Sequence, residues 1–422
     1  MEKRRVVVTG LGVVSPFGIG VDLFWNSIIN GKSGIKTLTR IEPEGHVVTI
    51  GGEISDFDEV VQKENLIDPK EFKRMDRFTQ FAIVASDEAI KDSALDISKE
   101  DDPYRVGVIF GSGAGGFETF ESQHLAMVKR GPTKCSPFTI PMLIANMAAG
   151  KISIRNGAKG VNKSVVTACA TSAHSIGDAF RAIQFDDADV VITGGSESVL
   201  TNLGLGAFSC ARTLSRRNDE PAKASRPYDV NRDGFVMGEG AGCLILEELN
   251  HAIKRGAKIY AEVVGYGQTG DAYDMVAPDP SGVSAGMAMK LAMKNANITP
   301  DKIDYINAHG TSTHLGDIAE SNAIAQIFGD KEQNSNLVVS STKSMHGHMI
   351  GATGAAESIA CIKAINEGII PPTINLEEQD PEVANLNYAP NKAVKKEVKY
   401  TLNNSFGFGG QNASLVFKKY EA

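Results

Sequence analysis

The stretch SVVTACATSAHSIGDAFRAIQ, residues 164–184, has the pattern of an apolar strand, a turn of small residues and then a helix. The same order returns in LVVSSTKSMHGHMIGATGAAESIACIKAI, residues 337–365. A second pair, RVVVTGLGVVSPFG at residues 5–18 and YAEVVGYGQTGDAYD at residues 260–274, also matches. Similarity over so long an interval indicates the doubling of a domain rather than a solenoid of short repeats.

The two halves are expected to divide near residue 255, into residues 1–255 and residues 256–422. No low-complexity segment or long linker separates them, so we expect one shared core. Apolar runs such as DVVITGG (residues 189–195) alternate with helical patterns such as AGMAMKLAMKNAN (residues 285–297), which predicts an α/β protein. Because the runs are continuously apolar, both faces of the strands should be buried.

The overall composition excludes several classes of function. The chain has 422 residues, 42% of them hydrophobic, and a net charge of −8, so binding to nucleic acid or to a membrane surface is not favoured. No run of 18 apolar residues occurs, and glycines with Ser15-Pro16 interrupt the apolar stretch after the basic N-terminus, which argues against a signal peptide. Five scattered cysteines without a C-x-x-C pattern indicate a reducing compartment, the cytoplasm.

Cys169 follows an apolar run and stands where a helix should begin. The free N–H groups and the positive end of a helix dipole favour a thiolate, so a cysteine at this place is a candidate nucleophile. The same N–H groups are suited to hold an oxyanion. The alternative is a small buried residue in a tight corner. The other cysteines are expected to be structural, because Cys243 lies in an apolar run and Cys361 in a helical pattern.

Two histidine segments are candidates for polar chemistry. His309 ends the run DYINAH, and Thr311 and Thr313 follow it, either as substrate contacts or as helix caps. In STKSMHGHMIGATGAAE, Lys343 precedes His348 by a glycine-containing turn, and the carboxylate of Glu357 is placed to orient an imidazole or to pair with Lys343.

Two other interpretations of these segments have to be weighed. The four imidazoles of His309, His314, His346 and His348 form a loose zinc-binding pattern. The sequence GSGAGG at residues 111–116 matches a dinucleotide-binding pattern, but no second strand with an acidic end follows at the required distance. Near the C-terminus, Phe408 lies in the turn FGFGG, whose glycines allow a close backbone approach to a ligand.

Together these motifs resemble the β-ketoacyl-acyl carrier protein synthases over essentially the whole chain. The resemblance rests on VTGLGVVSPFG, SRPYDVNRDGFVMGEGAG, DYINAHGTST and NNSFGFGG, and KRMDRFTQFA is closer to synthase II than to synthase I. It implies a thiolase-like fold, two similar α/β halves in a five-layer αβαβα arrangement, and a homodimer. It also implies an acyltransferase that elongates fatty acyl chains on acyl carrier protein by decarboxylative condensation and needs no cofactor and no metal.

The resemblance further implies roles for individual residues. Cys169 carries the acyl group, neutral His309 and His348 bind the malonyl thioester oxygen, and the backbone N–H groups of Cys169 and Phe408 bind the other carbonyl oxygen. Lys343 and Glu357 support the histidines, Thr311 and Thr313 contact the pantetheine arm, and Phe408 gates the acyl pocket. Carrier protein is acidic, so its dock should be basic; the candidates are Lys70, Lys73, Arg74, Arg77 and Arg212.

The chain departs from this family at three positions. His346 and Gln411 stand where threonine is usual, and His314 stands where proline is usual. Two relatives of the same fold are alternatives: a thiolase that uses coenzyme A, which needs a second cysteine in the C-terminal glycine turn, and a chain-length factor, which lacks the nucleophile. A binding module with an inert cysteine is the third alternative.

Overall fold

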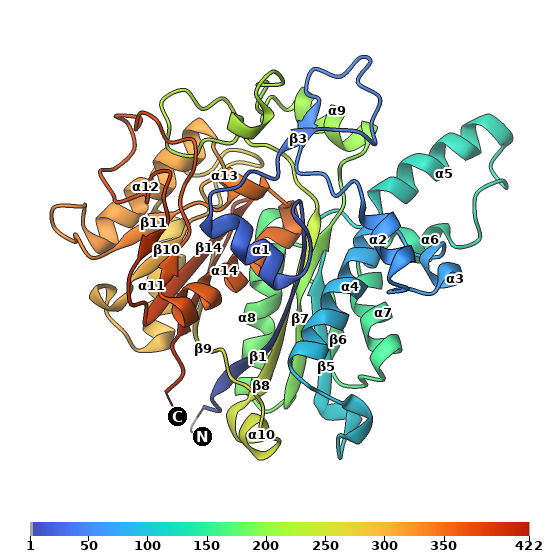
Figure 1. The fold of residues 1–422 in the computed structure, drawn as a ribbon, viewed down its shortest axis with the longest axis horizontal. Coiled ribbons are helices and arrows are strands. Elements are labelled where there is room, and N and C mark those ends of the chain that lie inside the picture. The colour runs from blue at the N-terminus through green and yellow to red at the C-terminus, as the bar shows by residue number, and fades with distance from the viewer. Residues whose placement is uncertain (1–2, 422) are drawn as a thin grey trace.

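One hydrogen-bonded sheet of eleven strands forms the centre of the described part of the protein (Figure 1). Ten of its strands have the order β6-β5-β7-β8-β1-β9-β15-β14-β10-β11, and the short strand β2 pairs with β1 beside them. The structure is a computed structural model that describes residues 3–421. The strands are β1 (Val6–Ser15), β5 (Val106–Gly111), β6 (Asn162–Lys163), β7 (Val190–Glu197), β8 (Gly240–Glu248), β9 (Ala261–Gly270), β10 (Tyr305–Asn307), β11 (Val338–Ser340), β14 (Tyr400–Gly407) and β15 (Gln411–Lys418). Shorter strands are β2 (Gly18–Ile19), β3 (Lys36–Thr37), β4 (Ile50–Gly51), β12 (Ile369–Ile370) and β13 (Val394–Lys395).

The sheet consists of two halves with the same strand order. In the first half β5 runs parallel to β6 and β7, β7 is antiparallel to β8, and β8 is antiparallel to β1. In the second half β10 runs parallel to β11 and β14, β14 is antiparallel to β15, and β15 is antiparallel to β9. The two halves meet where β1 pairs with β9. The doubling predicted from the repeated stretches is therefore confirmed.

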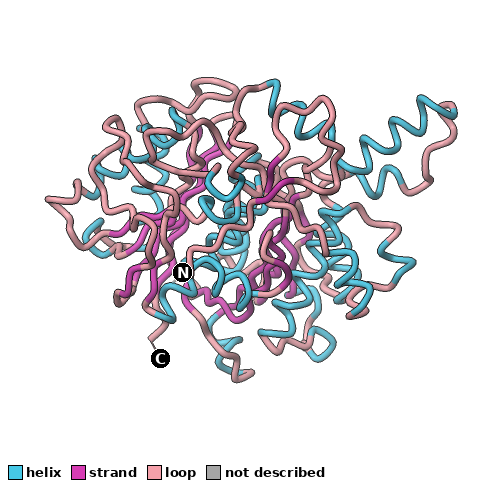
Figure 2. The backbone as a smooth tube through the Cα atoms, turned by 45° about the horizontal axis from the view of Figure 1, so that its top comes forward, coloured by secondary structure: helices cyan, strands magenta, loops and turns pink. Residues whose placement is uncertain are grey.

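Helices α8 (Thr171–Gln184) and α14 (Thr353–Glu367) lie between the halves of the sheet, and each contacts strands of both. The outer faces are covered by α4 (Arg77–Asp92) and α7 (Met147–Asn156) on one side and by α11 (Val283–Ala296) and α12 (His314–Phe328) on the other, which gives the predicted five layers (Figure 2). The remaining helices are α1 (Val21–Ile29), α2 (Phe57–Lys63), α3 (Pro69–Phe72), α5 (Phe117–Arg130), α6 (Thr139–Leu143), α9 (Asn202–Cys210), α10 (Leu249–Lys254) and α13 (Lys343–His346).

Both central helices begin with the same backbone turn, which we call an elbow. A 3₁₀ turn at Ala168–Ala170 precedes α8, and another at Ile350–Ala352 precedes α14. The first residue of each turn has a φ of 47°, a left-handed conformation that is strained for alanine and for isoleucine. Strain at two equivalent positions indicates that the packing of the core imposes this turn in both halves.

The burial of the strands agrees with the prediction, since every residue of β1, β5, β7 and β8 is buried. The predicted strand ahead of Cys169 is wrong. Only Asn162–Lys163 form a strand, and residues 164–167 are an extended loop at the edge of the sheet. Among residues 3–421, β5 is the only strand that pairs with β6, so the segment has no second strand to pair with, and Val166 remains 55% exposed. Among the described residues, no helix is both long enough and apolar enough to span a membrane.

A charged cluster at the end of β8 ties α10 to the sheet. His251 contacts Glu247 through Nδ1 at 2.8 Å and Glu100 through Nε2 at 3.0 Å, and Arg255 also donates to Glu247. Hydrogen bonds to Glu247 raise the pKa of His251 to about 9. Burial opposes ionisation of Glu247, but Arg255 and His251 outweigh it and lower the pKa of this carboxyl to about 2.

We predict that His251→Ala lowers the free energy of unfolding by about 2 kcal/mol at pH 7, because charged hydrogen bonds are lost. The folded-state pKa of His251 lies above its unfolded value, so this stabilisation is complete below about pH 6.5 and disappears as the pH rises through 9. Urea unfolding of both proteins from pH 6 to pH 10 measures the difference. An equal difference at pH 6 and pH 10 would contradict the assignment.

Candidate active site

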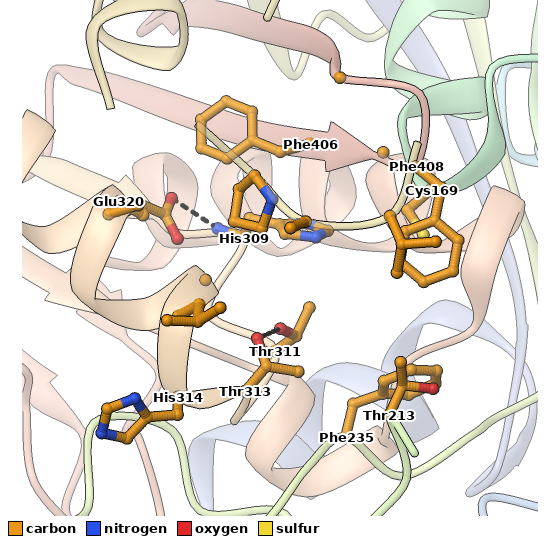
Figure 3. A pocket seen from close by; sticks show the side chains of 18 of the residues that line it. Cys169, Thr213, Phe235, His309, Thr311, Thr313, His314, Glu320, Phe406 and Phe408 are labelled. Carbon is orange, nitrogen blue, oxygen red and sulfur yellow. Dashed lines mark hydrogen bonds between the residues drawn. The ribbon is translucent and has the colours of Figure 1, made fainter. Parts of the chain in front are cut away.

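A cavity of about 460 Å³ lies between the two halves, and most of the predicted site residues line it (Figure 3). Its walls come from the elbow before α8, the ends of β10 and β14, and the loop that follows β9. The predicted residues that line it are Cys169, Arg212, His309, Thr311, Thr313, His348 and Phe408. Segments from both halves of the chain therefore meet here, as expected from the doubled fold.

Cys169 lies in the middle of the first elbow, directly before α8. It is 8% exposed, and burial raises the pKa of its thiol to about 12, although Lys343 and the N–H groups of Phe408 and Cys169 act in the opposite direction. The helix start was predicted correctly, and the N–H groups favour the thiolate as expected, but the loss of solvation outweighs them. The resting form is a thiol.

Two backbone N–H groups at the cavity are available for an oxyanion. The N–H groups of Cys169 and Phe408 both interact with the sulfur of Cys169, and neither donates to any other acceptor in the described part of the chain. The turn after β14 brings them together, because a Cβ added to Gly407 would lie 3.1 Å from the nitrogen of Cys169. A glycine at position 407 therefore allows this turn to lie close to the backbone of the first elbow.

His309 follows β10 and is fixed from behind by a carboxylate. Its backbone N–H and that of Gly310 donate to Glu320 at 2.8 Å each, and Asn404 also donates to Glu320 at 3.1 Å. Burial, followed by the charge of Lys343, holds the pKa of His309 well below its usual value, so the imidazole is neutral. Its Nδ1 is buried without a hydrogen-bond partner.

His348 stands edge-on to His309, with ring centres 5.4 Å apart and planes at 86°. Its Nδ1 lies 3.0 Å from the hydroxyl of Thr353, and its Nε2 is buried without a partner. Burial and Lys343 hold its pKa well below the usual value. In a neutral ring whose Nδ1 accepts from Thr353, Nε2 bears the hydrogen and is an unused donor.

Lys343 and Glu357 form a buried ion pair behind the histidines, with Nζ and Oε1 2.7 Å apart. Neither side chain lines the cavity. Burial raises the pKa of Glu357 to about 7, and Lys343 opposes this rise. The pair that the sequence suggested is therefore present, and it acts on the cavity through charge rather than by direct contact.

His346 points away from the cavity. Its Nδ1 contacts the carbonyl oxygen of Gly347 at 2.7 Å, its Nε2 contacts Thr342 at 3.0 Å, and its ring packs against Phe24. Burial lowers its pKa to about 3. Of the two histidines in the loop, only His348 faces the site. The described residues contain no cluster of three or more histidine, cysteine or acidic side chains that suits a metal ion.

The predicted residues Thr311 and Thr313 bond to each other through their hydroxyls at 3.0 Å, and Thr313 provides no side-chain cap to α12. Two other side chains of the cavity wall were not identified from the sequence. Phe235 packs on His348, and Phe208 packs on Phe408. The apolar patterns around these two phenylalanines contain no feature that separates a cavity wall from an ordinary core.

The predicted docking residues have different surroundings. Lys70, Lys73, Arg74 and Arg212 are exposed, and Arg74 also stacks on the ring of Phe138 at 4.8 Å. The prediction that Arg77 belongs to the exposed dock is wrong. Its side chain is 5% exposed and donates to Asp58 and to the carbonyl of Ile54. It begins α4, where its guanidinium is held between two phenylalanine rings, so it is part of the core.

The glycine-rich loop at residues 111–116 does not present free N–H groups to a phosphate. The N–H groups of Gly113 and Ala114 donate to the carboxylate of Glu197 at 2.7 and 3.1 Å. A carboxylate from the protein already occupies the place of an anion, so the rejection of a dinucleotide site agrees with the structure.

Comparison with known proteins agrees with this geometry. The model of the "Beta-ketoacyl synthase, N-terminal domain" matches residues 3–252, and that of the "Beta-ketoacyl synthase, C-terminal domain" matches residues 260–377. The chain belongs to the beta-ketoacyl synthase family. Relatives named 3-oxoacyl-[acyl-carrier-protein] synthase 2 are 49% identical in Synechocystis sp. and 50% identical in Staphylococcus aureus, each over 421 residues that cover 100% of this chain and 99% and 100% of the relatives.

Solved structures of beta-ketoacyl synthases have the same fold. A type II PKS ketosynthase in complex with its acyl-carrier protein aligns with a TM-score of 0.90 at 34% identity, covering both chains completely. A beta-ketoacyl synthase from Burkholderia phymatum aligns with a TM-score of 0.90 at 32% identity, over 99% of this chain and 100% of that one. The thiolase-like fold expected from the family resemblance is confirmed.

We predict that Lys343→Met destabilises the protein by about 3 kcal/mol, because Glu357 would be left buried without its partner. The double variant Lys343→Met/Glu357→Leu should recover most of this loss while its activity stays low. Urea unfolding and a condensation assay measure the two effects. If the double variant were as unstable as the single one, the ion pair would not be the cause.

Proposed function

We propose that the protein is a 3-oxoacyl-[acyl-carrier-protein] synthase that elongates acyl chains by two carbons, with Cys169 as its nucleophile. One observation carries the proposal. A cysteine, two unpaired N–H groups and two neutral imidazoles share a single cavity. This set matches a reaction that develops negative charge on two different carbonyl oxygens.

In the first step the sulfur of Cys169 attacks the thioester of an acyl carrier protein. A new carbon–sulfur bond forms, the bond to the pantetheine sulfur breaks, and the proton of Cys169 is transferred to the leaving thiol. Charge builds on the carbonyl oxygen as the tetrahedral intermediate forms. The N–H groups of Cys169 and Phe408 hold this oxygen.

In the second step a malonyl thioester loses CO₂, and the two electrons of the broken bond form an enolate. Its carbon attacks the acyl carbon on Cys169, the bond to the sulfur breaks, and the released thiolate takes up a proton from solvent water. His348 donates to the enolate oxygen through Nε2, and His309 acts as the second donor. Neutral rings suit this role because they stabilise the oxygen by hydrogen bonds without protonating it. The thioester itself acidifies the neighbouring carbon, so these steps use no cofactor.

The neighbouring residues have supporting roles in this proposal. Lys343 and Glu357 set the charge behind the histidines, Thr311 and Thr313 contact the pantetheine arm, and Phe408 gates the acyl pocket. The two alternatives of the same fold are not favoured, since Cys169 is present and the turn at residues 406–411 has no cysteine.

The proposed donor and acceptor are both attached to acyl carrier protein, as in the ketosynthase complex described above. The proposed dock is the exposed basic group Lys70, Lys73, Arg74 and Arg212. Arg212 lies at the rim of the cavity, where a pantetheine arm has to enter. A basic dock on a chain of net charge −8 gives a local attraction for an acidic partner.

We also propose a homodimer in the cytoplasm. Strand β6 is the edge of the sheet, and the extended loop after it leaves Val166 exposed. Helix α5 projects from the body on this side (Figure 1), and its apolar side chains Phe120, Leu125 and Val128 are exposed. A second copy on this face would cover both features.

All five cysteines are free, as expected for a reducing compartment.

The central test is Cys169→Ala, which should lower condensation by at least about 10³-fold, because no acyl–enzyme forms. The matched control is Cys210→Ala at the exposed cysteine, which should keep full activity. The assay uses malonyl-carrier protein with acyl donors from C4 to C16, and so also gives the preferred chain length. Retained activity in Cys169→Ala would refute the mechanism.

The two loop histidines should behave differently. His348→Ala should reduce CO₂ release from malonyl-carrier protein by about 10²-fold or more, because a donor to the enolate oxygen is lost. His346→Thr should stay within about threefold, because its ring faces the core. Trapped CO₂ measures both rates. The reverse order of effects would show that the roles of this loop are assigned wrongly.

Removal of the basic dock should weaken binding rather than chemistry. Lys73→Ala/Arg74→Ala should raise KM for carrier-protein substrates about five- to tenfold with little change in kcat, and the effect should shrink at high salt. The control is Lys302→Ala/Lys399→Ala, two lysines of the C-terminal half. An unchanged KM at low salt would place the dock elsewhere.

A further inference from the structure

Glu197, the last residue of β7, is a buried carboxylate that has no cationic partner among the described residues. Its Oε1 accepts from the hydroxyl of Ser112 at 3.0 Å and from the N–H of Ala114 at 3.1 Å. Its Oε2 accepts from the N–H groups of Gly113 and Gly351 at 2.7 and 3.1 Å. Four donors around one carboxylate form an anion site that the protein fills itself.

The doubled fold shows what this site corresponds to. Gly351 is the middle residue of the elbow before α14, and Cys169 is the middle residue of the elbow before α8. In the first elbow Cys169 lines the cavity, and its N–H has no acceptor among the described residues other than its own sulfur. In the second elbow the equivalent N–H of Gly351 donates to Glu197. One half keeps this donor for substrate, and the other half binds it to a carboxylate.

The carboxylate of Glu197 lies so close to Gly351 and Gly113 that no side chain fits at either glycine. A Cβ on Gly351 would lie 2.6 Å from Oε2, and a Cβ on Gly113 would lie 2.7 Å from the same atom. That Cβ on Gly113 would also lie 3.3 Å from the carbonyl oxygen of Ala168 and 3.6 Å from the side chain of Ile350. The loop at residues 111–116 is therefore held between the two strained residues that begin the elbows.

We propose that Glu197 is a positioning residue for the nucleophile, which fixes the second elbow and the loop at residues 111–116 against the elbow of Cys169. The role in catalysis rests on the proposed function. We call the four hydrogen bonds of Glu197 the clamp. The clamp keeps the N–H of Cys169 aimed at the acyl oxygen, and the negative charge of Glu197 disfavours the thiolate of Cys169 before substrate arrives.

The charged and titratable groups around the sulfur are consistent with this role. Lys343 favours the thiolate and Glu197 opposes it, while His309 and His348 line the same cavity as neutral rings. Burial raises the pKa of Glu197 itself to about 7. Its four hydrogen bonds act in the opposite direction and favour the charged carboxylate.

Two variants of Glu197 separate the effect of its negative charge from the effect of its hydrogen-bond geometry. Glu197→Gln removes the charge, and its amide nitrogen faces two N–H or O–H donors, so the clamp opens. Alkylation of Cys169 by iodoacetamide should then become at least threefold faster at every pH from 7 to 9.5. In Glu197→Asp the charge remains but the shorter side chain loosens the clamp, so alkylation should stay within twofold of the wild type. In both variants kcat for condensation should fall at least tenfold, with KM for carrier-protein substrates within twofold.

The matched control is Glu247→Gln, which changes a buried carboxylate of β8 that accepts from Thr9, His251 and Arg255. It should lower the melting temperature but leave the alkylation rate of Cys169 unchanged. Peptide mass spectrometry identifies the alkylated cysteine.

Three results would overturn the proposal: equal alkylation rates in Glu197→Gln and Glu247→Gln, faster alkylation in Glu197→Asp, or wild-type kcat in both Glu197 variants. The alkylation measurements need no condensation activity, so a failure of the proposed function would be seen separately in the wild-type assay.

Discussion

The packing of α8 against α14 between the two halves of the sheet is the constraint on which the rest of the structure depends. The helices approach so closely that a Cβ on Gly354 would lie 3.0 Å from the nitrogen of Ala173. The hydroxyl of Ser172 also accepts from the N–H of Ala355 at 2.9 Å. This contact fixes the N-terminal ends of both helices side by side, and it thereby places the nucleophile of one half next to the histidines of the other.

The same burial determines the electrostatics of the site. Desolvation and the nearby charge of Lys343 keep His309 and His348 neutral. Desolvation also keeps Cys169 protonated, although Lys343 favours its thiolate. Glu357 neutralises much of the charge of Lys343 within a buried pair. The cavity therefore offers hydrogen-bond donors rather than free charges, which suits a reaction whose negative charge moves from one carbonyl oxygen to another.

Much of this arrangement could be predicted from the sequence, because it depends on local patterns. Repeated stretches predicted the doubled fold, and the helical pattern after Cys169 predicted the start of α8. The charges in one loop and the next helix gave two possible roles for Glu357, and the structure shows the pairing with Lys343. The choice between His346 and His348 needed the family resemblance, since both imidazoles lie in the same loop.

The remaining features depend on contacts between distant segments. Glu197 meets a loop more than 80 residues away and an elbow more than 150 residues away, so nothing near it marks its role. Arg77 stands among exposed basic residues but is buried by Phe57 and Phe81. The run at residues 164–167 has a strand pattern but lies at a sheet edge with no further strand to pair with. Sequence patterns report local preference, whereas these three outcomes are decided by tertiary packing.

The central claim is that Cys169 holds the acyl group between the two steps. Its most direct test is mass spectrometry of the intact protein after incubation with an acyl-carrier protein in the absence of malonyl donor. The account predicts a single acyl adduct per chain, found on the peptide that contains Cys169 and removed by hydroxylamine. An unmodified Cys169 together with active condensation, or an adduct on Cys210 instead, would contradict it.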